Sequence, residues 1–146
     1  MIANRSVPTN TILPHVFYQN VAEAIPWLSE KFGFIEHYRY GDPASGAQLH
    51  LGDAWIMIAS VRDDRAIPAQ LGCATQSLTV FVDNVDAHYQ RTQAAGVKII
   101  EALHETIYGE RQYGAEDLDG HRWLFSQHAR DVSPDEWGAR ITNNHD

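Results

Sequence analysis

The chain has 146 residues, 44% hydrophobic and 21% charged, which is long enough for one globular domain or for two small halves sharing a core. Nineteen acidic and 11 basic residues give a net charge of −8, which argues against a nucleic-acid partner. No apolar run approaches the roughly 20 residues that span a bilayer, so we expect no membrane partner. A first segment without an apolar signal core and a single cysteine, Cys73, predict a cytoplasmic protein.

The first part of the chain reads as one strand, one helix and three further strands. Short β-rich runs predict strands at 11–19, 34–40, 48–51 and 54–60. Asn20 is a plausible N-cap for a helix over 21–33, because apolar residues recur there at helical spacing and Gly33 ends the pattern. The polar segment 61–75 predicts a linker.

The same order of elements is predicted again after the linker. Strands are expected at 76–83, 97–103, 111–116 and 121–127, with a helix over 85–96 that Asn84 caps. The tail carries Ser133 and Pro134 followed by two acidic residues, which predicts a short helix bearing Trp137.

Short residue patterns of the first half recur in the same order in the second half. Phe17-x-x-Asn20-Val21 returns as Phe81-x-x-Asn84-Val85, and Gly52-x-x-Trp55-Ile56 returns as Gly120-x-x-Trp123-Leu124. Several landmarks in one order favour an internal duplication over a chance alignment of two α+β segments. We therefore predict an α+β fold built from two copies of a βαβββ module.

Several strings of the second half resemble the vicinal oxygen chelate superfamily, which includes glyoxalase I, extradiol dioxygenases, and fosfomycin- and bleomycin-resistance proteins. They are Phe81-Val82-Asp83-Asn84-Val85-Asp86-Ala87-His88, Ala94-Ala95-Gly96-Val97, Tyr108-Gly109-Glu110-Arg111 and Asp117-Leu118-Asp119-Gly120-His121-Arg122-Trp123. Leu118 stands where the family usually has proline. The resemblance implies one domain over 1–146, with a curved mixed sheet around a cavity and frequent pairing as a homodimer. Its parts would be module one at 10–60, the linker at 61–75, module two at 76–128 and a tail at 129–146.

The family's metalloenzymes hold a divalent metal with His or Glu from the first, fourth, fifth and eighth strands. We locate the corresponding positions in this sequence from strand alternation and from the internal repeat. They are Leu13, Ile56, Ser77 and Leu124. Aliphatic side chains have no lone pair to offer a metal, so we expect no bound metal and no cofactor. A slip of two residues in the first strand would bring His15 to one position without supplying a second strong ligand.

The same alternation predicts the residues that line the cavity. They are Leu13, His15, Phe17, His50, Ile56, Ser77, Thr79, Phe81, Arg122 and Leu124. Arg122 would anchor an anionic or carbonyl ligand, or else pair with an acid such as Glu116. Trp55 and Trp123 are expected to face the helices, and His88 the solvent. The facing of Tyr38 and Tyr40 is not assigned.

A mostly apolar cavity with a few polar anchors favours a metal-free protein that binds a small molecule, as the bleomycin-resistance members of the family do. The charge of −8 slightly favours a cationic ligand. One alternative is a lyase, isomerase or dioxygenase that uses a non-standard metal set around His15 and His50. Another is a structural or regulatory module whose cavity has collapsed.

Overall fold

The computed structural model describes residues 4–5 and 12–142, and these form two βαβββ modules. The first contains β1 (His15–Tyr18), α1 (Val21–Phe32), β2 (Ile35–Tyr40), β3 (Gly46–Leu51) and β4 (Ala54–Ser60). The second contains β5 (Ser77–Phe81), α3 (Val85–Ala94), β6 (Lys98–Glu105), β7 (Glu110–Glu116) and β8 (Arg122–His128). A 3-10 helix follows at Pro134–Trp137, where the sequence predicts a short helix. The predicted α+β class is confirmed, with two four-stranded mixed sheets.

The chain divides into two compact units that follow the modules with one exception. The first unit is Met1–Gln76 together with the loop Asp117–His121, and the second is Ser77–Glu116 with Arg122–Asp146. The loop between β7 and β8 therefore belongs to the first unit. No helix among residues 4–5 and 12–142 is long and apolar enough to cross a membrane.

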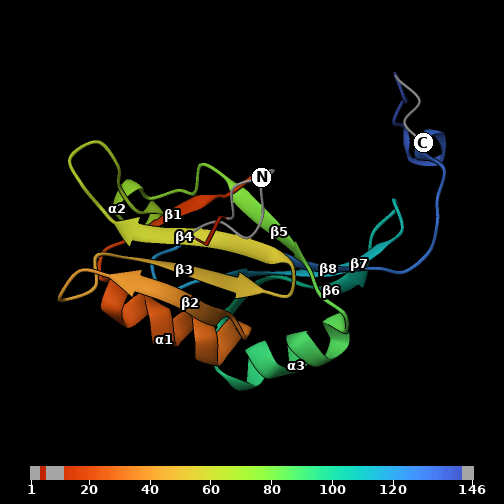
Figure 1. Ribbon diagram of the computed structural model, residues 1–146. Helices are drawn as coiled ribbons and strands as arrows, with labels where there is room; N and C mark the ends of the chain where they lie inside the picture. Colours follow the sequence, from red (N-terminus) through yellow and green to blue (C-terminus); the bar gives the residue numbers. More distant parts are fainter. Residues whose placement is uncertain (1–3, 6–11, 143–146) are drawn as a thin grey trace. The chain divides into compact units, whose positions relative to one another are not determined.

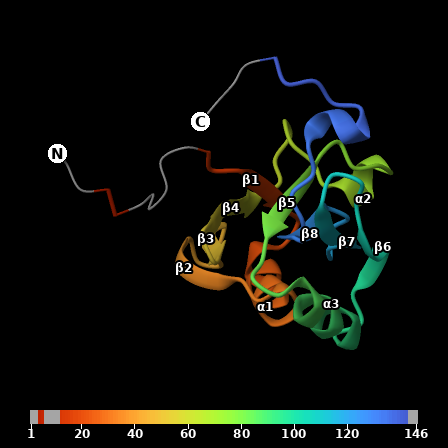
Figure 2. The same cartoon turned by 90° about the vertical axis from the view of Figure 1, so that its right-hand side faces the viewer.

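The first sheet has the strand order β1-β4-β3-β2, with α1 along one face (Figures 1 and 2). β1 runs parallel to β4, and the other neighbours are antiparallel. Small and aliphatic side chains alternate toward α1, together with one tyrosine, and each is 3% exposed or less: Val16, Tyr18, Ala47, Leu49, Ile56 and Ile58. Burial of such a set is the main favourable term for this layer.

Both long helices begin as the sequence predicts. The side chain of Asn20 accepts a hydrogen bond from the backbone N–H of Glu23, and Asn84 accepts one from Ala87. Each asparagine has extended backbone angles and satisfies one of the unpaired donors of the first turn. Gly33 then ends α1 with a φ of 88°, a conformation that favours glycine.

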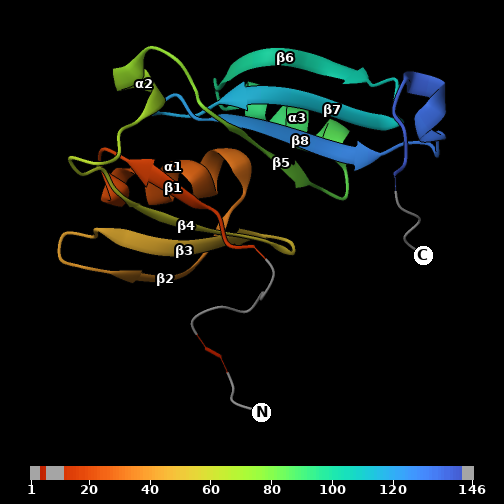
Figure 3. The same cartoon turned by 90° about the horizontal axis from the view of Figure 1, so that it is seen from above.

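The second sheet has the order β5-β8-β7-β6, with α3 against one face (Figure 3). Trp123 and Phe125 of β8 are fully buried on that face, as is Tyr113 of β7. His88 of α3 packs on the Phe125 ring at 4.2 Å and lies 2.5 Å from the Tyr113 hydroxyl. The expectation that His88 faces solvent is therefore wrong, because a buried phenol takes it as a hydrogen-bond partner.

The predicted strands are confirmed with small shifts at their ends, and Thr11 lies outside the described residues. The larger difference lies in segment 61–75, which contains the short helix α2 (Pro68–Leu71) in addition to irregular chain. The backbone N–H of Ala69 in α2 donates to the carbonyl of Asp119 at 3.1 Å. This contact packs α2 against the loop Asp117–His121 inside the first unit.

Asp117 ties this loop to β1. Its Oδ2 accepts a hydrogen bond of 2.6 Å from the fully buried Tyr18 hydroxyl. Its Oδ1 accepts from the backbone N–H groups of Asp119 and His121. The Asp119 carboxylate in turn accepts from the N–H of Gln19 at 2.8 Å. Burial and the charge of Asp117 raise the pKa of Tyr18 well above its ordinary value.

We expect Tyr18→Phe to lower the free energy of unfolding by about 1.5–3 kcal/mol at pH 8, because the buried Asp117 carboxylate loses its partner. The folded-state pKa of Tyr18 is raised, so the stability that its neutral phenol contributes is complete at neutral pH. That contribution falls once the phenol of the unfolded chain ionises above about pH 10. The difference in the free energy of unfolding between wild type and Tyr18→Phe, measured by urea unfolding, should therefore be smaller at about pH 11 than at pH 8.

Tyr108→Phe is the matched control. The Tyr108 hydroxyl donates to Gln112 at 3.2 Å, and the side chain is 38% exposed, so its loss should cost less than about 1 kcal/mol. Equal losses for the two variants would show that the Tyr18–Asp117 bond has no special weight.

Candidate functional site

The face of the first sheet that points away from α1 carries most of that module's ring side chains. The strand register aligns Phe17, Ala59, Gly46 and Tyr40 in one row across the sheet, and His15, Met57, Gln48 and Tyr38 in the next. Trp55 then lies opposite His50. We call the aromatic face the set formed by Phe17, His37, Tyr38, Tyr40, His50, Trp55 and Met57.

Contacts among these side chains hold them in place. The His50 ring stacks on Trp55 with centroids 4.3 Å apart and 21° between the planes. The His37 ring meets the same indole edge-on at 5.4 Å, and its Nδ1 lies 2.6 Å from Oε1 of Gln48. Gln48 is fully buried and donates to the Met57 sulfur at 3.6 Å. These contacts fix the orientation of the His50, His37 and Trp55 rings.

Gly46 makes room for one wall of this face. A Cβ built on Gly46 would lie 2.0 Å from Cζ of Tyr40, so the tyrosine ring rests directly on the glycine backbone. Ala59 follows Gly46 in the same row, and Phe17 stands beyond it. Gly46 and Ala59 are both buried, and the absence of a side chain at Gly46 is what lets the Tyr40 ring lie flat against the sheet.

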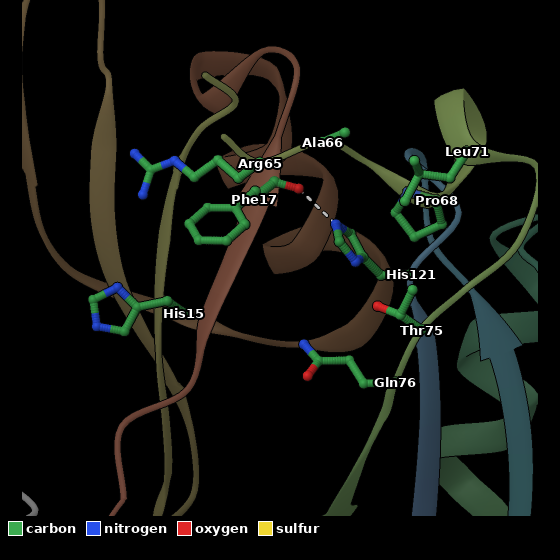
Figure 4. A pocket seen from close by; sticks show the side chains of 9 residues that line it. All are labelled: His15, Phe17, Arg65, Ala66, Pro68, Leu71, Thr75, Gln76 and His121. Carbon is green, nitrogen blue, oxygen red and sulfur yellow. Dashed lines mark hydrogen bonds between the residues drawn. The ribbon is translucent and has the colours of Figure 1, made fainter. Parts of the chain in front are cut away.

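A cavity of about 310 Å³ lies at the β1 edge of the sheet, and all of its lining residues belong to the first unit. Figure 4 shows the Phe17 ring and Arg65 at one side of it and His121, Pro68 and Leu71 at the other. Its remaining lining residues are His15, Ala66, Thr75 and Gln76. Phe17 belongs both to this cavity and to the aromatic face, so the two are continuous at that ring.

The anchored loop supplies one wall of the cavity. Nε2 of His121 lies 2.5 Å from the carbonyl oxygen of Phe17, shown as the dashed line in Figure 4. The imidazole also meets the Tyr18 ring edge-on at 5.0 Å. His121 is therefore held by contacts on two sides rather than left free in a turn.

Of the predicted cavity residues of the first half, His15 and Phe17 line the cavity. His50 lies on the aromatic face, and Leu13 precedes β1 and is not among the lining residues, so their place in a ligand pocket stays a prediction. Ile56 does not join them. It is 3% exposed and aligns with Leu49 on the face toward α1, so its assignment to the cavity is wrong.

The assignment of Ile56 is wrong because the two turns that were aligned in the internal repeat differ in length. β3 and β4 are joined by two residues, Gly52 and Asp53, whereas the longer loop Asp117–His121 joins β7 and β8. Phe17 pairs with Ala59 and its counterpart Phe81 pairs with Ser126, so the true equivalent of Leu124 is Met57. Aligning the turn glycines instead shifts β4 by one residue, which exchanges its two faces. Trp55 consequently lies on the aromatic face and not toward the helix.

The second half of the predicted set shares one face of its own sheet. Ser77 pairs with Arg122 and Thr79 with Leu124, while Phe81 pairs with Ser126 on the side away from α3. The Arg122 guanidinium is exposed and lies 3.9 Å from Glu116, the acid named as its alternative partner. That these residues line a ligand pocket stays a prediction.

The donor set does not fit the family's kind of metal site. The four corresponding positions are Leu13, Met57, Ser77 and Leu124, none of which brings an imidazole or a carboxylate. Within residues 4–5 and 12–142, no three His, Cys, Asp or Glu side chains are grouped so that they could hold a metal. β4 separates β1 from β3, so His15 and His50 start from strands about 10 Å apart.

Several residues of the site are not among those predicted from the sequence. Arg65, Thr75 and Gln76 lie in or next to the segment that the sequence predicts to be a linker, and His121 is predicted only as the first residue of a strand. His37 reaches the aromatic face because β2 has a register irregularity between Glu36 and Tyr38. The density of aromatic residues in β2 is the one signal in the sequence that points to this face.

Two βαβββ modules, each with a four-stranded mixed sheet, define the class of fold to which this chain belongs. The chain belongs to the Glyoxalase/Bleomycin resistance protein/Dioxygenase superfamily, whose family model matches residues 10–125. An uncharacterized protein of Mycobacterium bovis is 28% identical over 144 residues, covering 91% of this chain and 93% of the relative.

Solved structures show the same fold. TioX from Micromonospora sp. ML1 is 28% identical, with a TM-score of 0.68 over 85% of this chain and 100% of its own. The fosfomycin resistance protein FosX from Listeria monocytogenes is 14% identical, with a TM-score of 0.61 over 89% of this chain and 98% of its own. The latter likeness concerns the fold alone.

The different surroundings of the two repeat tryptophans predict different costs of removal. Trp123→Ala should lower the free energy of unfolding by about 3–5 kcal/mol, because Trp123 is fully buried against α3. Trp55→Ala should cost only about 1–2 kcal/mol, since Trp55 is partly exposed on the aromatic face. Urea unfolding measures both, with Trp123→Phe as a substitute if the alanine variant does not fold. Equal costs would contradict the β4 register, which turns Trp55 away from the helix layer.

Proposed function

We propose that this chain binds a small aromatic molecule, without a metal, on the aromatic face of its first sheet and in the adjoining cavity. The observation that carries the proposal is the preorganised row of rings around Trp55. His50 is stacked on one side of the indole and His37 edge-on, while the Tyr40 ring lies on Gly46 in the row that runs through Ala59 to Phe17. Aromatic groups bind well to such surfaces through offset stacking and burial of apolar area.

The chemistry of the site favours binding over bond-breaking. Two of the imidazoles near the rings are already engaged: His37 with Gln48, and His121 with the Phe17 carbonyl. Such groups orient a ligand, whereas a general base needs a free lone pair directed at a proton of the substrate. The cavity of about 310 Å³ weighs against the alternative of a collapsed interior. The homodimer and the cytoplasmic location stay predictions.

Titration with neutral 2-naphthamide tests the binding. We expect one molecule per chain with a dissociation constant on the order of 10–100 µM by calorimetry, accompanied by quenching of indole fluorescence. Trp55→Ala should weaken binding about three- to tenfold, the weight of one stacking contact. Trp27→Ala is the control, because Trp27 lies on α1 and contacts Phe32. Undetectable binding, or equal effects of the two variants, would contradict the proposal.

Metal content separates this proposal from the enzymatic alternative. Protein purified without a histidine tag should contain far less than one equivalent of zinc, iron, nickel or manganese by elemental analysis, because the donor positions are occupied by Leu13, Met57, Ser77 and Leu124. Added metal should not shift the melting temperature more in wild type than in His15→Ala. A stoichiometric metal lost in His15→Ala or His50→Ala would favour a lyase, isomerase or dioxygenase.

A further inference from the structure

Arg65 is held over the Phe17 ring by a tight turn. The backbone groups of Arg62 and Arg65 exchange two hydrogen bonds of 3.2 and 3.1 Å, which closes a turn with two acidic residues at its tip. The guanidinium carbon of Arg65 then lies 4.3 Å from the centroid of the Phe17 ring. Arginine stacks in this way because its planar cation is attracted by the face of an aromatic ring.

The cation of Arg65 lacks an acidic partner among the residues that the structure describes. Other arginines of the chain make paired contacts: Arg39 binds Glu36 through two nitrogens, and Arg111 binds Asp86. Within residues 4–5 and 12–142, no carboxylate forms an ion pair with Arg65, and its buried Nε has no hydrogen-bond acceptor. A guanidinium that stacks on a ring and has no carboxylate partner keeps its charge available for an acceptor that reaches its terminal nitrogens.

The residues around Arg65 indicate what kind of ligand would carry the hydrogen-bond acceptor. The cavity next to it has apolar walls from Phe17, Pro68 and Leu71 and polar ones from Thr75 and Gln76. Figure 4 shows the Arg65 guanidinium and the His15 ring on the same side of β1 as the Phe17 side chain. Because the guanidinium covers one face of the Phe17 ring, a ligand ring packed against the edge of Phe17 would present a substituent to the guanidinium.

We infer that Arg65 and Phe17 form a subsite for the carboxylate of an aromatic acid, an inference that rests on the proposed function. The rigid fork of a guanidinium matches the two oxygens of a carboxylate. One arginine in a chain of net charge −8 suits a monoanion better than a doubly charged phosphate. The subsite therefore predicts an acidic ligand, whereas the net charge of the chain favours a cationic one.

Two pairs of isosteric probes test the subsite: 2-naphthoate against 2-naphthamide, and indole-3-acetate against indole-3-acetamide. In wild type we expect each acid to bind at least about tenfold more tightly than its amide, the weight of one charge-assisted hydrogen-bonded pair. Arg65→Gln should remove this preference and leave the affinity for the amides within about twofold. Arg62→Gln, which removes the same charge from the exposed end of the turn, should keep the preference.

The outcomes separate this inference from the proposed function. If acids and amides bind equally, or if Arg62→Gln acts like Arg65→Gln, the subsite is refuted while aromatic binding stands. If neither acid nor amide binds, both are refuted. The melting temperature of Arg65→Gln supplies a further check. A purely structural Arg65 would lower the melting temperature and weaken acid and amide alike, whereas a ligand-binding Arg65 splits the two.

Discussion

The buried hydrogen bond between Tyr18 and Asp117 is the interaction on which the candidate site depends. A carboxylate withdrawn from water must be satisfied by hydrogen bonds, and Asp117 accepts them from one phenol and two backbone N–H groups. These bonds set the shape of the loop that presents His121 to the Phe17 carbonyl. The same loop gives α2 a partner through the Asp119 carbonyl. The loop that carries His121 and the helix α2, which form two walls of the cavity, are therefore both positioned through the buried Asp117.

The first sheet carries its core residues on one face and the residues of the candidate site on the other. Toward α1 it buries residues such as Val16, Leu49 and Ile58, whose packing favours the folded state. Away from α1 it carries rings that are partly exposed, one of which, Tyr40, lies directly on Gly46. A strand turns alternate side chains to opposite faces, so one strand serves both tasks without conflict.

The two modules have diverged in their use of polar groups. In the second module, His88 and Thr92 both bind the Tyr113 hydroxyl in the layer between α3 and the sheet. Burial raises the pKa of Tyr113 well above its ordinary value and keeps it a neutral partner. In the first module, the imidazoles of His37 and His50 lie instead on the open face, against Trp55. The duplicated architecture thus holds a structural histidine in one copy and candidate ligand-facing ones in the other.

Local signals in the sequence by themselves determined the two modules, the helix starts and the order of helices and strands along the chain. Asn20 and Asn84 cap helices through contacts three residues away, and alternation along β5 and β8 needs no distant information. Family membership likewise followed from short strings in the second half, consistent with the match over residues 10–125.

Only the tertiary structure decided which residues meet at the site. The facing of Ile56 and Trp55 depends on the pairing of β4 with β1, because two turns of different length make the repeat slip by one residue. Arg65 and His121 are far apart in the chain and carry no motif. They reach one cavity because a short turn and a buried Asp117 fold their segments against β1. Local propensity sets elements, whereas contacts between distant segments depend on how those elements pack.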